Sequence, residues 1–291
     1  MRFQFIADHR DEFPVRRMCK VLDVSRSGYY AWRGRPRSKR EMANQRLYKK
    51  IKAVYNESHK TYGSPRIYEV LKQQDIACSE NRVARLMRLR GLRAKKTKRF
   101  KTTTKRDKAA RPAPNLLERD FTADRPNHKW VSDITYIRTA EGWLYLAAVL
   151  DLFSRRIVGW AMSDRMTSDL TVSALKMAVQ QRQVDPGLLH HSDQGSQYTA
   201  QEYQQLLEDW GIEVSMNGAG SWYDNAAMES FFGTLKGEWV YHHAYRTRVQ
   251  ARADIFYYIE AFYNRRRLHS TLGYLSPMVY EQRYHENATF A

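Results

Sequence analysis

Cysteine is scarce in this sequence of 291 residues. Its only two cysteines, Cys19 and Cys78, lie far apart. Neither has the nearby cysteine or histidine partners that a zinc site or a disulfide framework would show. Both are therefore interpreted as reduced residues that take part in packing.

Long apolar runs are also missing, although 43% of the residues are hydrophobic. No stretch approaches the roughly 20 apolar residues of a membrane span, and the N-terminus lacks the apolar segment of a secretory signal. The composition therefore predicts a soluble globular protein of two or three domains. We expect it in the cytoplasm of a bacterium, close to the nucleoid and away from membranes.

Acidic residues are few in the first part of the chain. Residues 1–120 hold 33 Lys or Arg against 12 Asp or Glu, a net charge of +21, while residues 121–291 have a net charge of −3. Because neutralising DNA phosphates releases condensed counterions, this segregation favours a DNA-binding front half joined to a nearly neutral domain. The alternative is a basic surface that serves only solubility.

The apolar spacing near the N-terminus predicts a helix-turn-helix. Two short helices, Val15–Leu22 and Ser27–Arg33, are separated by a break at residues 23–25, and a longer helix is expected at Lys39–Glu57. We therefore assign residues 1–57 to a first helix-turn-helix region.

A second helical pair, at Arg66–Gln74 and Glu80–Arg90, predicts a helix-turn-helix-like region over residues 58–95, with Ser79 as the N-cap of its second helix. The second helix carries several guanidinium groups that could face DNA. A solvated basic helix face is the alternative. The predicted contacts are Arg82, Arg85 and Arg88.

Residues 96–123 are interpreted as a basic linker, because Lys, Arg, Thr and Pro replace most apolar residues there. The linker is expected to lie along DNA as a cationic strap, although a plain flexible tether would have the same composition. The predicted DNA contacts are Lys95, Lys96, Lys98 and Arg99.

Beyond residue 124 the pattern changes to strands. Three segments rich in β-branched and aromatic residues predict an antiparallel meander, and the following segments alternate between helices and short strands. The predicted strands are Lys129–Arg138, Trp143–Asp151, Arg156–Met162, Gly187–Ser192 and Ile212–Ser215. The predicted helices are Leu170–Arg182, Ala200–Trp210, Asn225–Tyr241 and Ala251–Asn264. Residues 124–285 are thus expected to form an α/β domain with a mixed five-stranded sheet flanked by helices, including a C-terminal helix.

Three carboxylates occupy suggestive places in this domain. Asp133 lies inside an apolar strand, where an ionised carboxylate costs desolvation unless a metal ion or another cation pairs with it. Asp193 directly follows a strand, with Gly195 allowing close backbone approach, and Glu229 lies in the first turns of a helix. Taken singly, each has an ordinary explanation: an edge position, a turn and a complement to the helix dipole.

Their combination resembles a known family: the OrfB-type transposases, encoded by the second reading frame of insertion-sequence-three elements and related to retroviral integrases. The resemblance covers nearly the whole chain. The motifs are WVSDITYI, HHSDQGSQY, YDNAAMESFFGTLK and YNRRRLHSTLGYLSP. Thirty-five residues separate Asp193 from Glu229, as the family pattern requires, and Lys236 is the basic residue expected seven positions after the glutamate.

The resemblance implies a ribonuclease-H-like fold and a transposase that uses Asp133, Asp193 and Glu229 as catalytic metal ligands. Two Mg²⁺ ions, which Mn²⁺ can replace, would activate the attacking water or hydroxyl and stabilise the leaving oxygen. The enzyme would cleave transposon-end DNA and join the freed 3′-hydroxyl to target DNA. Lys236 would hold a phosphate near the scissile bond.

Other polar residues near these motifs have two interpretations. Asp151 is a weaker candidate ligand because it lacks the family spacing, and His190 and His191 are assigned to packing rather than to metal binding. Asn225 and Gln194 either contact DNA or position the carboxylates.

Arg265, Arg266 and Arg267 are expected to contact phosphates, with a structural role as the alternative. The loop at residues 218–220 is expected to become ordered when DNA binds.

The expected partners are double-stranded DNA, further copies of this chain on DNA, and an upstream-frame partner or fusion. Two other functions fit parts of the sequence. One is a DNA-binding regulator with an inactive integrase-like domain. The other is a tyrosine recombinase using Tyr263 or Tyr274, but that chemistry calls for an arginine three residues after His269, where Leu272 stands.

Overall fold

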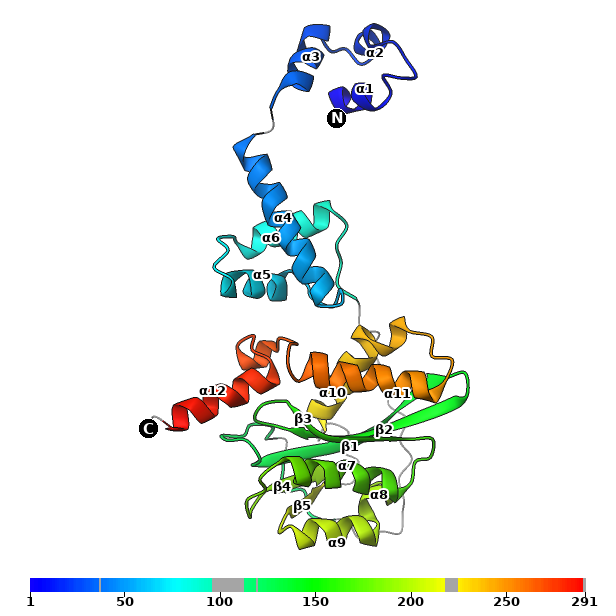
Figure 1. The fold of residues 1–291 in the computed structure, drawn as a ribbon, viewed down its shortest axis with the longest axis vertical. Helices are drawn as coiled ribbons and strands as arrows, with labels where there is room; N and C mark the ends of the chain where they lie inside the picture. The colour runs from blue at the N-terminus through cyan, green and yellow to red at the C-terminus, as the bar shows by residue number, and fades with distance from the viewer. Residues whose placement is uncertain (37, 96–112, 119, 218–224, 290–291) are drawn as a thin grey trace.

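The computed structural model describes residues 1–36, 38–95, 113–118, 120–217 and 225–289. Figure 1 shows two helical groups and a sheet domain arranged along the long axis of the molecule. The predicted helices of the basic front half are all present, and their ends lie within two residues of the expected ones. No helix in the described ranges is long and apolar enough to cross a membrane.

The first helical group has a small core of its own. It contains α1 (Arg2–Asp8), α2 (Val15–Val21) and α3 (Arg26–Gly34), and α1 was not predicted. The Ser25 hydroxyl accepts a hydrogen bond from the Gly28 amide at 3.0 Å and caps α3. The buried side chains of this core are Ile6, Met18, Cys19 and Tyr29. Cys19 is thus a packing residue, as expected.

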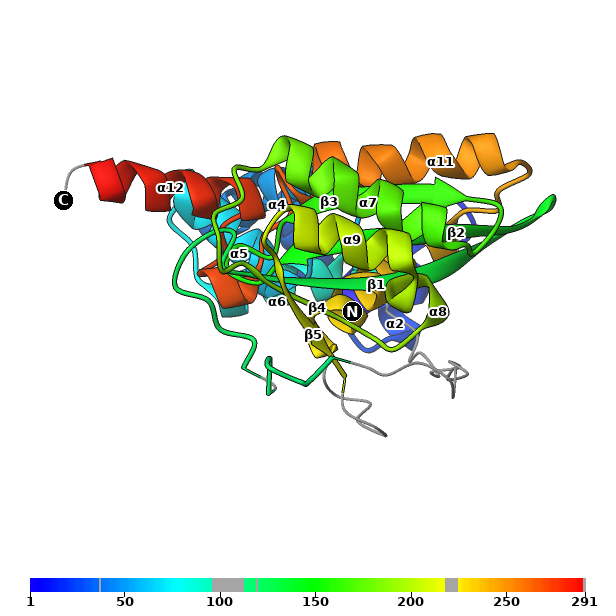
Figure 2. The same cartoon turned by 90° about the horizontal axis from the view of Figure 1, so that it is seen from below.

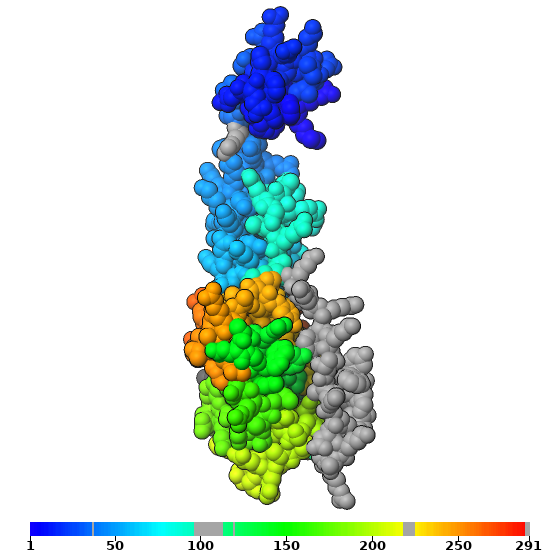
Figure 3. Space-filling model, turned by 90° about the vertical axis from the view of Figure 1, so that its right-hand side faces the viewer, coloured from blue at the N-terminus to red at the C-terminus, as the bar shows by residue number. Residues whose placement is uncertain are grey.

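The second helical group contains α4 (Lys39–Glu57), α5 (Ser64–Gln73) and α6 (Glu80–Leu89). Their apolar faces meet in one core of buried residues, which includes Leu47, Ile51, Ile67, Leu71 and Val83. The sequence had grouped α4 with the first helix-turn-helix, but its apolar stripe faces α5 and α6. The break in packing therefore falls before α4, and the space-filling view shows the first group as a separate lobe (Figure 3).

The sheet has the order β3-β2-β1-β4-β5 and is mixed, as predicted. β1 pairs antiparallel with β2 and β2 with β3, while β4 runs parallel to both β1 and β5. The strands are β1 (Lys129–Thr139), β2 (Gly142–Asp151), β3 (Ile157–Ser163), β4 (Leu189–Ser192) and β5 (Glu213–Met216). This mixed order, with helices on both faces, is the ribonuclease-H-like arrangement that the resemblance implied.

Helices cover both faces of the sheet. On one face lie α7 (Ser168–Gln181), the short α8 (Ser196–Thr199) and α9 (Gln201–Asp209), which Figure 2 shows in front of the sheet. A Cβ atom at Gly159 would lie 2.2 Å from the Ala174 carbonyl oxygen, so glycine is what lets α7 approach β3 so closely.

The opposite face is covered by α10 (Ala226–Glu238) and α11 (Arg248–Phe256). The sequence predicted one helix through Asn264, but α11 continues as a π-helix, η2 (Tyr257–Tyr263). The turns η1 (Val240–His242) and η3 (Ser270–Leu272) and the helix α12 (Pro277–Thr289) complete the chain.

A polar joint connects the second helical group to the sheet domain. The Tyr62 hydroxyl donates to the Arg266 carbonyl at 3.1 Å and accepts from the Leu268 amide at 2.7 Å. Arg66 of α5 lies 3.4 Å from the carboxylate of Glu238, at the end of α10. The joint therefore reaches the helix that carries Glu229.

Candidate active site

The register of the sheet brings Asp133 and Asp193 side by side. In the parallel pair of β1 and β4, Val131 pairs with His191, and each aspartate stands two residues beyond this pair. β4 accompanies β1 only from Lys129 to Val131. Asp133 therefore lies where the edge of β1 is no longer paired with β4, and Asp193 begins the loop beside it.

Each of the two aspartates accepts a backbone hydrogen bond. The Ile134 amide donates to Asp133 Oδ1 at 2.7 Å, and the Gly195 amide donates to Asp193 Oδ1 at 2.9 Å. A Cβ atom at Gly195 would lie 2.9 Å from that same oxygen. The turn therefore requires glycine, as predicted, because a side chain at position 195 would collide with the Asp193 carboxylate.

The two carboxylates are difficult to ionise together. Burial and the charge of Asp193 raise the pKa of Asp133 to about 8, and the charge of Glu229 acts in the same direction. Burial also raises the pKa of Asp193. Among the described residues, no salt bridge pairs either aspartate with a protein cation. A cation from solution would relieve this strain.

Glu229 enters the site from the first turn of α10 and remains exposed. Asn225 is the N-cap residue, but its side chain does not cap the helix; Asn225 Nδ2 donates instead to the Ser132 carbonyl at 3.0 Å. The buried Asn225 thus ties the start of α10 to the residue that precedes Asp133.

Lys236 lies two turns further along α10 and is buried, with 4% of its surface exposed. Its Nζ stands 4.6 Å from the centre of the Tyr136 ring. Burial lowers the pKa of Lys236 to about 8, while the charge of Asp133 opposes this shift. A buried ammonium group therefore lies close enough to Asp133 for the two charges to interact.

The three carboxylates do not form a finished metal cage. No group of three His, Cys, Asp or Glu side chains in the described parts of the chain is close enough to hold an ion as it stands. Asp133 and Asp193 are neighbours, whereas Glu229 is exposed at the helix end. The donor set still fits Mg²⁺, since carboxylate oxygens are its preferred protein ligands.

Comparisons with known proteins show the family of this chain. Models of the integrase core domain match residues 123–221 and 229–284, and a model of an HTH-like domain matches residues 42–100. The chain is 42% identical over 285 residues to the transposase InsF for insertion sequence IS3A of Escherichia coli (strain K12), covering 97% of this chain and 99% of InsF. The chain belongs to the transposases of the insertion-sequence-three (IS3) family.

Two further proteins are similar to this chain. An uncharacterized 31 kDa protein of insertion element IS600 from Shigella sonnei is 44% identical over 271 residues, 93% of this chain and all of that protein. Among solved structures, the magnesium complex of the HTLV-2 integrase catalytic core domain is similar over 53% of this chain and 96% of its own, with 19% identity and a TM-score of 0.40.

Asp151 and the two histidines are held by protein atoms. Asp151 accepts hydrogen bonds from the amides of Asn127 at 2.7 Å and Ser154 at 3.0 Å. His190 Nε2 lies 2.7 Å from the Ser132 hydroxyl, and His191 Nδ1 lies 2.8 Å from the Ser215 hydroxyl. These contacts match the packing roles expected of the histidines.

The buried hydroxyl of Tyr198 was missed by the sequence analysis. Tyr198 closes the motif HHSDQGSQY, and its hydroxyl has no hydrogen-bond partner in the described structure. Burial raises its pKa, followed by the charges of Tyr203, Asp133 and Asp193. This buried tyrosine therefore lies near both aspartates. Its place inside the HHSDQGSQY motif was the only sequence signal that could have identified it.

The predicted DNA contacts of α6 differ in exposure. Arg85 and Arg88 are exposed, whereas Arg82 is half-buried and its Nε donates to the Asn44 side chain at 3.0 Å. Lys95 is half-buried, with its Nζ 5.5 Å from the centre of the Trp239 ring. Lys96, Lys98, Arg99 and residues 218–220 lie outside the described residues.

The three arginines of the YNRRRLHS motif also differ. Arg265 and Arg266 are exposed, but Arg267 is 3% exposed and donates two hydrogen bonds of 2.7 Å to Glu238. Arg267 thus has the structural role that the sequence left open. Tyr263 is 1% exposed and donates to the Arg155 carbonyl, so it is not placed to attack DNA.

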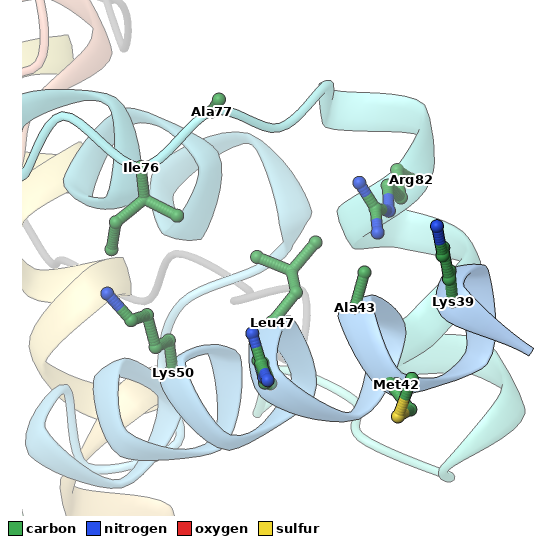
Figure 4. Close-up of a pocket in the computed structure, with 9 residues that line it drawn as sticks. Lys39, Met42, Ala43, Leu47, Lys50, Ile76, Ala77 and Arg82 are labelled. Carbon is green, nitrogen blue, oxygen red and sulfur yellow. The ribbon is translucent and has the colours of Figure 1, made fainter. Parts of the chain in front are cut away.

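A basic cavity of about 380 Å³ lies between α4 and α6 and was also missed. Figure 4 shows Leu47 and Ile76 on its inner side, with Arg82 facing α4 across it. Helical spacing places its other cations on one side of α4. They are Lys39, Arg46 and Lys50. The positive surface of the HTH-like domain is therefore not confined to α6.

Proposed function

We propose that this IS3-family transposase cuts the ends of its insertion sequence and joins the freed 3′-hydroxyl to target DNA. Asp133, Asp193 and Glu229 would hold two Mg²⁺ ions for this reaction, with Mn²⁺ as a substitute. The observation that carries the proposal is the parallel register that puts Asp133 beside Asp193, two buried carboxylates whose pKa values are raised.

The chemistry supplied by bound Mg²⁺ is Lewis acidity, which favours ionisation of the attacking hydroxyl and stabilises the leaving oxygen. The chain supplies the ligand positions. Asp133 is fixed within a strand, and Asp193 is fixed by the Gly195 amide. Glu229 is exposed on the first turn of α10 and would complete the set by a change of side-chain rotamer.

Lys236 would hold a phosphate oxygen next to the scissile bond. Its pKa is lowered by burial, so an approaching phosphate would favour the charged ammonium form and gain attraction in a poorly solvated place. Asn225 would keep α10 aligned with β1 through its bond to the Ser132 carbonyl.

The basic residues outside the site would hold double-stranded DNA. Their proposed contacts are to phosphates, which set the position of a protein on DNA without reading its sequence. The set consists of Arg82, Arg85, Arg88, Lys95, Lys96, Lys98, Arg99, Arg265 and Arg266. We further propose that the protein acts in the bacterial cytoplasm as an oligomer on DNA, with an upstream-frame partner or fusion contributing to end recognition.

The test is incubation of the full chain with end-labelled duplex DNA carrying the terminal repeat of its element, with and without Mg²⁺. We expect nicks at the repeat boundary that require Mg²⁺ and that Asp193→Asn abolishes. Asp209→Asn, at the exposed end of α9, is the matched control and should cleave normally. Metal-independent binding with no cleavage by any of the three proteins would instead indicate a DNA-binding regulator.

A further inference from the structure

A row of cations runs along one side of α4 and borders the basic cavity between α4 and α6. Lys39, Arg46 and Lys50 are separated by seven and four residues, so their side chains leave the helix on the same side. Eleven residues of helix correspond to about 16 Å. All three residues are exposed. We call them the cation row.

The cation row has no anionic partner among the described residues. None of its side chains takes part in a salt bridge or a side-chain hydrogen bond in the described parts of the chain. The residues that line the cavity include no Asp or Glu. Glu41 follows Lys39 by two residues and so lies on a different side of α4. Like charges along one side of a helix repel each other, and a bound anion would relieve this repulsion.

A fixed cation from α6 faces the cavity from the other helix. Arg82 Nε donates to the Asn44 side chain of α4 at 3.0 Å, which holds the half-buried guanidinium group in place. Figure 4 shows Arg82 and Lys50 on either side of Leu47, so cations lie at both ends of the cavity. Because the Arg82 side chain is already held, it loses little conformational freedom when an anion binds.

The inner surface of the cavity is apolar. An apolar floor with cations at its rim suits the backbone of a nucleic acid, in which charged phosphates alternate with less polar sugars. Lys and Arg are the usual donors to phosphate oxygens, and the sugars can lie on the floor. The floor consists of Met42, Ala43, Leu47, Ile76 and Ala77.

We propose that the cation row and Arg82 hold the sugar–phosphate backbone of double-stranded DNA, so that the duplex crosses α4 as well as α6. The inference rests on the proposed function, which takes DNA as the substrate, and it adds a contact site on α4. Arg82 connects this site to Arg85 and Arg88, which follow it at intervals of three residues along α6. The site would fix how the duplex lies on the HTH-like domain without reading its sequence.

DNA fits this surface better than an acidic protein segment does. Duplex DNA carries one charge per about 1.7 Å of its axis, so phosphates come within reach of every cation of a row about 16 Å long. An acidic segment would need carboxylates at matching intervals. Residues 1–120 also hold 33 Lys or Arg against 12 Asp or Glu, and this excess of positive charge attracts a polyanion from a distance.

The test measures binding of the full chain to a duplex with the terminal repeat and to an unrelated duplex of the same length. Binding is measured in EDTA at several salt concentrations, so that cleavage does not contribute. The double variant Arg46→Gln/Lys50→Gln should reduce the slope of log affinity against log salt by about two units, about one per lost phosphate contact. At about 0.1 M salt its affinity should fall at least about tenfold, equally for both duplexes.

The matched control is the double variant Lys49→Gln/Lys52→Gln. Both lysines are exposed on α4 and neither lines the cavity, so this variant removes the same charge from other sides of the helix. Its slope should stay close to that of the wild type. Equal reductions in the two double variants would overturn the proposal, because they would show a general effect of charge.

An unchanged slope in Arg46→Gln/Lys50→Gln would also overturn the proposal, and it is the result expected if the cavity takes an acidic protein segment. Melting curves check that each variant is folded. If this double variant does not fold, Lys39→Gln at the first residue of α4 decides the question. It should reduce the slope by about one unit, and an unchanged slope would again contradict the proposal.

The cavity proposal and the catalytic proposal fail separately. The salt slope is measured without metal, whereas Mg²⁺-dependent cleavage by wild type and by Asp193→Asn tests the catalytic assignment. Cleavage that requires Asp193, in a protein whose slope ignores Arg46 and Lys50, would reject the cavity proposal alone. A slope that depends on these two residues, in a protein whose cleavage ignores Asp193, would reject the catalytic proposal alone. A wild type that binds neither duplex would reject both.

Discussion

Two kinds of buried carboxylate occur in the sheet domain. Glu281 of α12 is 4% exposed and pairs with Arg156 and Arg182, each at 2.7 Å, while the Ser154 hydroxyl donates to it at 2.7 Å. Burial alone would raise the pKa of Glu281, but these hydrogen bonds and charges outweigh it and leave the pKa lowered. Asp133 and Asp193 lie near each other and are in no salt bridge among the described residues, and burial raises the pKa values of both.

The difference in partners distinguishes a structural carboxylate from catalytic ones. A carboxylate surrounded by arginines has its charge neutralised by the fold, and it holds a helix in place. A buried carboxylate in no salt bridge, with a second carboxylate nearby, is stabilised in its ionised form when it binds a cation from solution. A buried carboxylate can therefore be structural or catalytic, and the charges around it indicate which of the two roles it has.

The largest expected effect is on catalysis. Asp133→Asn should lower Mg²⁺-dependent DNA cleavage by at least about a thousandfold, because the lost ligand forfeits several kcal/mol of transition-state stabilisation. It should also raise the melting temperature of the metal-free protein, since a neutral amide avoids both the cost of burying a charge and the repulsion from Asp193. Cleavage assays and calorimetry check the two signs. A lower melting temperature of Asp133→Asn would contradict the prediction, because it would mean that Asp133 stabilises the fold as Glu281 does.

Glu281→Gln should have the opposite profile. Removing one partner of a buried ion pair leaves Arg182 and Arg156 uncompensated, which costs about 3 kcal/mol of folding free energy. Cleavage per folded molecule should stay near the wild-type value. Urea unfolding measures the first quantity and active-site-normalised kinetics the second. The exposed Glu202→Gln on α9 is the control and should change neither.

The third prediction concerns pH and Mg²⁺. Because the pKa of Asp133 is raised to about 8 in the folded protein, metal-free stability should fall as pH rises from about 4 to 8, where only the unfolded state ionises freely. Mg²⁺ must displace that proton, so its affinity should rise by up to about tenfold per pH unit below 8. Melting curves at pH 6 and pH 8, with and without Mg²⁺, test this. Asp133→Asn should show no such pH dependence.

The smallest effect is expected at the joint. Glu238 has a buried partner, Arg267, and a more exposed one, Arg66, which lies 3.4 Å away. Arg66→Met should therefore cost less than about 1 kcal/mol, whereas Arg267→Met should cost about 3 kcal/mol. Denaturation of both variants measures the difference. Equal losses of stability in the two variants would contradict this, because the ion pair of Glu238 with Arg66 would then stabilise the protein as much as its ion pair with Arg267.

The sequence was informative where local pattern decides structure. Alternating β-branched and aromatic residues located β1 and β2 to within one residue, and Ser79 was correctly identified as the cap of α6, accepting a hydrogen bond from the Arg82 amide at 3.4 Å. The spacing of Asp133, Asp193 and Glu229 was visible without coordinates. The sequence could not show that Asp133 and Asp193 lie side by side, because this depends on the pairing register of β1 and β4.

Long-range partners defeated the sequence-based analysis. A C-terminal helix was expected, but the bounds of α12 were not predicted, because it is held by the contacts of Glu281 with Arg156 and Arg182, more than 90 residues earlier. α4 was grouped with its neighbours in sequence because nothing local shows which helices its apolar stripe will meet. The sequence could not show which of the three consecutive arginines is buried. Arg267 is buried because it pairs with Glu238 of α10, which is distant in sequence.

The hydrogen bond from Asn225 to the Ser132 carbonyl has a further consequence for β1. A strand that outruns its neighbour exposes unpaired carbonyl and amide groups, which invite strands of other molecules and promote aggregation. Here a side-chain amide occupies the carbonyl next to Asp133, as the backbone of another strand otherwise would. This border of β1 therefore has one free acceptor fewer with which the strand of another molecule could pair.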